Sequence, residues 1–239
     1  MSLLMLFAAL ALIASADVES DWDSKKTREV QARYGECVIK RHLATAQHFV
    51  LTPDLEKSAW RKDVNKIADG SCLLNAAKSA GGVQMTFPAD TMRYALADAL
   101  VRREFSTGPA LSIKEATPLI QPTVDEAEYT PKPGKKYRKS ELKELAEGRT
   151  KQAVIVFLAN FGECVVRAEP SGSHKLLMAQ PASAEEHAPF TALLPSFGLC
   201  LPAGQTLAFN KATLRGAIAM NYYRLAHSPR VAAAAGASK

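Results

Sequence analysis

Two segments of this 239-residue chain are nearly identical although they lie far apart, YGECV at 34–38 and FGECV at 161–165. Each is followed by a second cysteine, which has a leucine directly after it. This cysteine is Cys72 in the first case and Cys200 in the second. The intervals from one cysteine to the next, 35 and 36 residues, are almost equal. A repeated segment followed by a repeated cysteine interval indicates an internal duplication, so the chain is expected to fold as two related units.

A third match follows, where residues 85–102 align with residues 207–224 and Arg93 stands opposite Arg215. Apolar residues recur at every fourth position in both segments, which is typical of a helix with one buried face. The segments that lead into the two G-E-C motifs have helical spacing as well. The glycine of each motif either allows a close helix approach or marks a bend. The apolar positions of the lead-in segments are Val30, Tyr34, Cys37 and Val38, and Val154, Phe157, Phe161, Cys164 and Val165.

We therefore predict a mainly α fold of two tandem three-helix units, each with one disulfide. The stretches 83–87 and 205–209 alternate apolar and polar residues before the closing helices. We also consider a short β pairing between these two stretches, because alternation is typical of strands.

Four cysteines allow three disulfide connectivities. Locality selects Cys37–Cys72 and Cys164–Cys200, because a unit that once existed alone had to pair its own thiols. The cysteines contain no C-x-x-C pair and have no histidine close by in sequence, which argues against zinc. Each cysteine has a counterpart in the other copy, which argues against a catalytic thiol.

The N-terminal residues 1–16 have the features of a cleaved secretory signal. The apolar run 3–13 is too short to span a bilayer, which needs about 20 residues. The small residues 14–16 then match a signal-peptidase site, although no Lys or Arg precedes the run. We expect cleavage after Ala16 and a periplasmic or secreted product without a transmembrane helix; the alternative is a buried N-terminal helix.

The mature chain divides by composition. We predict a first unit at 17–105, a Pro-rich basic linker at 106–139, a second unit at 140–228 and a disordered tail at 229–239.

Several helix boundaries follow from capping residues. Thr52 is expected to cap a helix that Gly70 ends, and a short helix from 140 is expected to end at Gly148. Ser183 has Glu186 three residues later, which is the spacing of a capping box.

Four residues near the repeated motifs are candidates for a binding groove between the units. Arg93 and Arg215 would supply positive charge for an anion, and Glu36 and Glu163 could act as an acid–base pair. The alternative for all four is structural. The glutamates would form helix-surface or interhelical ion pairs, with Arg93 and Arg215 as candidate partners, and the arginines would form salt bridges to a neighbouring helix.

The linker contains a basic run with one tyrosine, formed by Lys132, Lys135, Lys136, Arg138 and Lys139. The net charge of the chain is +6. We consider contact of this run with anionic lipid or polymer, against the alternative of a solvated loop; an exported protein meets little nucleic acid.

No hydrolase, phosphate-loop or dinucleotide motif occurs. The five histidines lack metal-ligand spacing, so we expect no metal and no cofactor. They are His42, His48, His174, His187 and His227.

The signal, the duplicated [YF]-G-E-C-V unit, the second Cys-Leu pair and the closing F-x-x-x-x-[ML]-R helix resemble exported alphaproteobacterial proteins, the sphingomonad group in particular. That family has no established activity, so the resemblance implies a periplasmic localisation and no catalytic residues.

Three functions are considered. The first is a non-enzymatic binding or interaction module that takes another envelope protein or a small anionic ligand. The second is an envelope-associated structural or stress protein that contacts anionic lipid or polymer. The third is a small secreted enzyme that uses Glu36 or Glu163.

Overall fold

The computed structural model describes residues 25–52, 63–79, 81, 89–107, 110, 113, 116–202 and 209–228. The proposed signal, the tail, most of the two alternating stretches and residues 53–62 lie outside these ranges. Within them the chain is helical and contains no strand, which confirms the prediction of a mainly α fold.

The helices of the first half of the chain are α1 (Lys25–Arg41), α2 (Leu43–Leu51), α4 (Gly70–Ser79) and α5 (Ala89–Phe105), and residues 63–67 are also helical. The second half contains α6 (Glu126–Tyr129), α7 (Lys139–Ala168), α8 (Pro170–Met178), the 3-10 helix η1 (Ala184–Glu186), α9 (His187–Ala192), α10 (Leu194–Cys200) and α11 (Lys211–Ala226).

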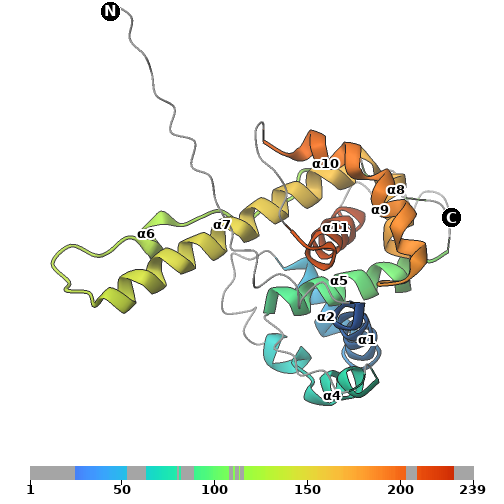
Figure 1. Cartoon of the computed structure of the whole chain (residues 1–239), viewed down its shortest axis with the longest axis horizontal. Helices are drawn as coiled ribbons and strands as arrows, with labels where there is room; N and C mark the ends of the chain where they lie inside the picture. The colour runs from blue at the N-terminus through green and yellow to red at the C-terminus, as the bar shows by residue number, and fades with distance from the viewer. Residues whose placement is uncertain are drawn as a thin grey trace, which may run out of the picture.

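Helices α5 and α11 form the centre of the molecule and pack against each other (Figure 1). In α11, 13 of the 16 residues are buried, as expected for a helix that is covered on every side. The helices α1 and α2 pack against α5, and α4 packs against α1. In the other half α7 and α8 pack against α11, and α10 packs against α7. One continuous apolar core runs through both halves.

Both predicted disulfides are present. Cys37–Cys72 joins α1 to α4, and Cys164–Cys200 joins α7 to α10. Disulfides of this kind are typical of proteins that fold in an oxidising compartment.

The two G-E-C glycines allow helices to approach closely. A Cβ at Gly35 would collide with the backbone oxygen of Ala95 on α5, and a Cβ at Gly162 would collide with that of Ala217 on α11. Neither glycine interrupts its helix, so close approach, rather than a bend, accounts for both.

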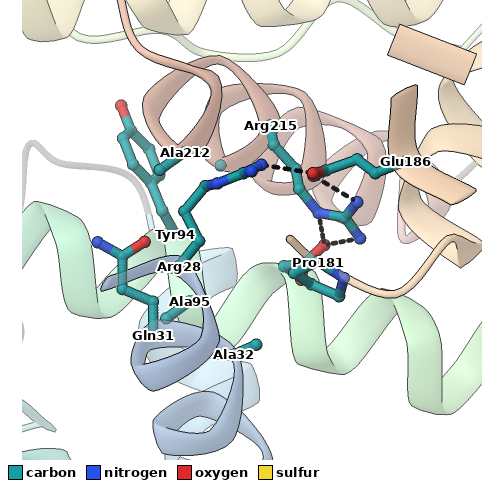
Figure 2. Close-up of a pocket in the computed structure, with 11 residues that line it drawn as sticks. Arg28, Gln31, Ala32, Tyr94, Ala95, Pro181, Glu186, Ala212 and Arg215 are labelled. Atoms are coloured by element: carbon teal, nitrogen blue, oxygen red, sulfur yellow. Dashed lines mark hydrogen bonds and ion pairs between the residues drawn. The ribbon is translucent and has the colours of Figure 1, made fainter. Parts of the chain in front are cut away.

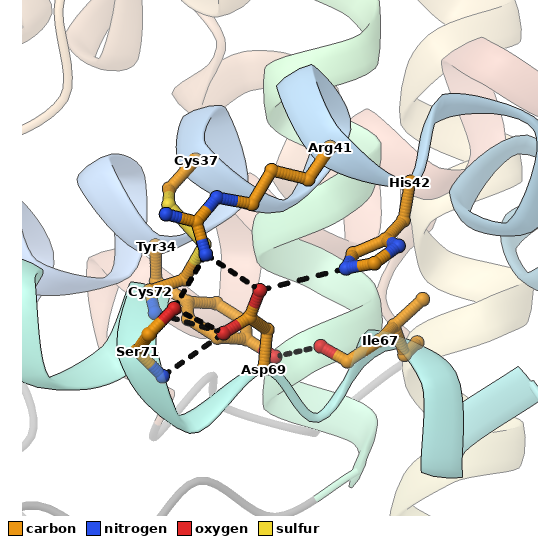
Figure 3. Close-up of a disulfide and its surroundings, with 8 residues drawn as sticks. All are labelled: Tyr34, Cys37, Arg41, His42, Ile67, Asp69, Ser71 and Cys72. Carbon is orange, nitrogen blue, oxygen red and sulfur yellow. Dashed lines mark hydrogen bonds and ion pairs between the residues drawn. A yellow bond between two sulfur atoms is a disulfide. The ribbon is translucent and has the colours of Figure 1, made fainter.

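The first disulfide lies beside the start of α4, at a residue where a helix end was predicted (Figure 3). Gly70 begins α4 instead of ending a helix, because the Asp69 side chain accepts hydrogen bonds from the backbone N–H groups of Ser71 and Cys72 at 2.9 and 3.2 Å. The Ser71 hydroxyl and the Arg41 guanidinium also bind this carboxylate and hold the pKa of Asp69 far below its usual value. Thr52 follows the end of α2 and its backbone N–H donates to the His48 carbonyl, so it ends that helix.

The helix end predicted at Gly148 is a second boundary that was wrong, as α7 shows. Helix α7 runs without a break through this residue. A glycine within a helix costs only about 1 kcal/mol, and here it makes room for the Tyr129 ring, which a Cβ would approach to 3.0 Å.

Candidate functional site

A buried arginine lies where the two halves of the molecule meet. Arg215 of α11 is 4% exposed and binds Asp98 of α5 at 2.9 Å and Glu186 of η1 at 3.1 Å. Its Nη atoms also donate to carbonyl oxygens at the end of α8, namely those of Leu176, Leu177 and Ala179, at 2.8–3.0 Å. Arg215 therefore satisfies the open C-terminal carbonyls of one helix and ties it to two others.

The ion pairs continue on both sides of Arg215. Arg28 of α1 binds the second oxygen of Glu186, and Figure 2 shows the two arginines reaching that carboxylate from different helices. Asp98 also binds Arg102, which in turn reaches Glu36 at 3.3 Å. These six residues form an alternating row of charges, which we call the central ion-pair row. Every buried carboxylate in it faces two guanidinium groups, which limits the cost of removing the charges from water.

Two adjoining cavities open beside this row and share Arg28 and Glu186. The smaller one, about 30 Å³, is lined by Gln31, Tyr94 and Pro181 among others (Figure 2) and has room for about one water molecule. The larger one, about 300 Å³, has the size of a small organic ligand. We call it the Lys211 cavity, and its lining residues are Arg28, Ala182, Ser183, Ala184, Glu186, His187, Phe190 and Lys211.

The Lys211 cavity combines positive charge with an apolar wall. Arg28 and Lys211 are cationic, and the one carboxylate, Glu186, is already bound by two arginines. Phe190 is 7% exposed, and the Lys211 ammonium lies 6.0 Å from the centre of its ring. Such a lining suits a small anion that carries an apolar or aromatic body.

The four residues predicted to form a groove do not come together there. Only Arg215 lines one of the two cavities. Arg93 donates instead to the carbonyls of Val50 and Thr52 at the end of α2, and its guanidinium lies 5.5 Å from the centre of the Phe49 ring.

The two glutamates belong to separate ion pairs, as the structural alternative predicts, but the partner of neither is Arg93 or Arg215. Glu36 binds Arg102, with 41% of its side chain exposed. Glu163 binds Arg167 at 2.7 Å and accepts hydrogen bonds from the backbone N–H of Leu119 and the side chain of Gln121. Glu163 therefore holds the connecting segment against α7.

Ser183 is the N-cap residue of η1, so the helical start is where the sequence placed it, but the predicted capping box does not form. The Ser183 side chain makes no capping hydrogen bond, and Glu186 is buried in the central ion-pair row. This role of Glu186 could not be predicted, because its partners come from α1 and α11, which are distant in the chain. Arg28, His187 and Lys211 lie outside every motif and were missed for the same reason.

The basic run lies far from the cavities, at the tip of the projection formed by α6 and the first half of α7 (Figure 1). Within the described part of the chain, no group of three or more His, Cys, Asp or Glu side chains could hold a metal ion. No described helix is long and apolar enough to cross a membrane.

No protein-family model matches this chain, and no curated protein and no solved structure matches it either.

Proposed function

We propose that this protein is a non-enzymatic binding module that holds a small organic anion in the Lys211 cavity. The observation that carries this proposal is the pairing of Arg28 and Lys211 with the apolar face of Phe190 in one cavity of about 300 Å³. A carboxylate or phosphate would meet the cations while the rest of the ligand covered the ring.

The central ion-pair row supports this assignment because it fixes one wall of the cavity. Glu186 is held by Arg28 and Arg215, and its Oε2 accepts from the backbone N–H of Ala182 at 3.2 Å. A wall built from buried, paired charges stays in place without a ligand, which lowers the entropic cost of binding.

The compartment is part of the proposal. We propose that the chain is exported after cleavage behind Ala16 and acts in the periplasm or outside the cell. The two disulfides support an oxidising destination, and the apolar run at 3–13 supports export.

We also propose that the two halves arose by duplication. Two contacts that occur in both halves at aligned positions support this origin. Each G-E-C glycine packs on an alanine of the closing helix, Ala95 or Ala217. Arg93 and Arg215 each bind the terminal carbonyls of the helix that follows the G-E-C helix, which is α2 in one half and α8 in the other.

Calorimetric titration tests the proposed function with benzoate as the anionic probe and benzamide as its neutral counterpart. We expect benzoate to bind and benzamide to bind at least about tenfold more weakly, since a charged hydrogen bond contributes about 1.5–3 kcal/mol. Lys211→Glu should abolish the preference for benzoate. Lys175→Glu, which makes the same charge change on the exposed face of α8, should leave it unaltered. Equal binding of the two probes, or an unchanged preference in Lys211→Glu, would refute the proposal.

A further inference from the structure

A helical arm projects from the body of the molecule. It consists of the segment 121–138, which includes α6, and the first half of α7, which returns alongside it (Figure 1). All buried residues of α7 lie between Leu158 and Val166. Residues 139–156, about 27 Å of helix at 1.5 Å per residue, therefore contain no buried residue, whereas Phe157 packs against the core. Core packing does not account for this part of the arm.

The arm is held together by its own contacts. Arg149 of α7 binds both oxygens of Glu126 on α6 at 2.8 and 2.7 Å. Tyr129 packs on Gly148, and the Gln152 side chain donates to the Thr123 carbonyl at 3.4 Å. These contacts pair the two sides of the arm from α6 back towards the body, so the arm can present its tip as a defined element.

The tip concentrates positive charge. All five cations of the basic run are exposed, and no acidic residue occurs from 130 to 140. Its charge of +5 compares with +6 for the whole chain. The turn is ordered: Gly134 has φ 78°, the Lys132 N–H donates to the Tyr137 hydroxyl at 3.1 Å, and Lys135 lies 4.6 Å from the centre of the Tyr137 ring.

We propose that this tip docks the protein on a membrane surface rich in anionic phospholipid. A cluster of cations at the end of a projecting arm can reach a flat negative surface without obstruction by the body. Leu142 in the first turn of α7 is 44% exposed, and the Tyr137 ring is next to the cations. An apolar and an aromatic side chain beside cations fit the headgroup region of a bilayer better than a fully hydrated soluble polymer.

Co-sedimentation of the full chain with lipid vesicles tests the proposal. We expect strong binding to vesicles of about 30 mol% phosphatidylglycerol in phosphatidylcholine and little binding to pure phosphatidylcholine. Each cation near an anionic surface raises the binding affinity about fivefold. Lys135→Glu/Lys136→Glu should weaken binding at least about 25-fold, since two such contributions are lost. Lys78→Glu/Lys175→Glu makes the same charge change on the exposed body and should have little effect. Leu142→Ser should weaken binding without altering its salt dependence.

Three outcomes would overturn the proposal. One is equal binding to both kinds of vesicle. Another is an equal loss in the tip and body variants, which would mean that net charge alone attracts the protein. The third is tip-dependent binding to soluble polyphosphate without binding to vesicles, which would assign the tip to a polymer. Circular dichroism of each variant checks that the helices are intact.

Discussion

At the scale of single residues, the glycines of the two G-E-C motifs have the clearest role. Gly35 and Gly162 are buried, and each lies against the backbone of a central helix. A methyl group at either position would meet a main-chain oxygen, which cannot move aside as a flexible side chain can. Close helix packing therefore requires a glycine at this position of the motif. This requirement explains why the motif occurs twice, without a catalytic role for the neighbouring glutamate.

We predict that Gly35→Ala and Gly162→Ala each lower the free energy of unfolding by about 1–3 kcal/mol, the usual cost of overpacking. Gly198→Ala is the matched control, because it also lies within a helix but has no atom within 4 Å of the added Cβ. That variant should gain about 0.5–1 kcal/mol. Urea unfolding measures all three. If the three variants had equal stabilities, the packing role of the motif would be wrong.

At the scale of elements, the ends of α5 and α11 are joined by a polar cluster around Glu104. Its carboxylate accepts hydrogen bonds from Gln47 of α2 at 2.9 Å and from the Tyr223 hydroxyl at 2.8 Å, and it binds His227 at 3.2 Å. Burial opposes the charge on Glu104, but the hydrogen bonds from His227, Gln47 and Tyr223 outweigh burial and lower its pKa. The hydrogen bond with Glu104 raises the pKa of His227 although burial opposes the shift.

This cluster predicts a pH dependence of stability. The contribution of His227 to the free energy of unfolding is complete below its ordinary pKa of 6.5. It is lost as the pH rises through the raised pKa that His227 has in the folded protein. The contribution of Glu104 is complete above 4.5 and is lost as the pH falls through its lowered pKa. The contact between them is therefore strongest from about pH 4.5 to 6.5.

Urea unfolding at about pH 5.5 and about pH 8.5 tests this prediction in the wild type and in Glu104→Gln. The wild type should lose more stability than the variant between these values, because only the wild type loses a charged histidine contact. Glu36→Gln, which removes a more exposed carboxylate on α1, should keep the wild-type dependence. An identical pH dependence in wild type and Glu104→Gln would exclude the cluster as the cause.

At the scale of the whole molecule, local and repeated features could be predicted and non-local ones could not. The disulfides followed from the repeat, and the helical faces around Val38 and Val165 followed from apolar spacing. The helix start at Gly70 was missed because a single capping side chain, Asp69, decides it.

The candidate site depended on partners from distant parts of the chain. Arg28 and Glu186 are 158 residues apart, and Arg215 and Asp98 are 117 apart. Aligned positions also have different surroundings, since Arg215 binds two carboxylates at the junction of the halves while Arg93 binds the carbonyls of α2. Sequence repetition could identify both arginines, but only packing determines which of them lies beside a cavity.

The central claim is that the Lys211 cavity holds a small anion, and a native mass spectrum tests it most directly. The protein would be purified from the periplasm of an export-competent host, as wild type and as Lys211→Glu. We predict that the wild type carries a small acidic molecule in addition to the chain with its two disulfides, and that the variant lacks this added mass. A wild-type spectrum that shows only the bare chain, or an added mass that persists in Lys211→Glu, would contradict the account.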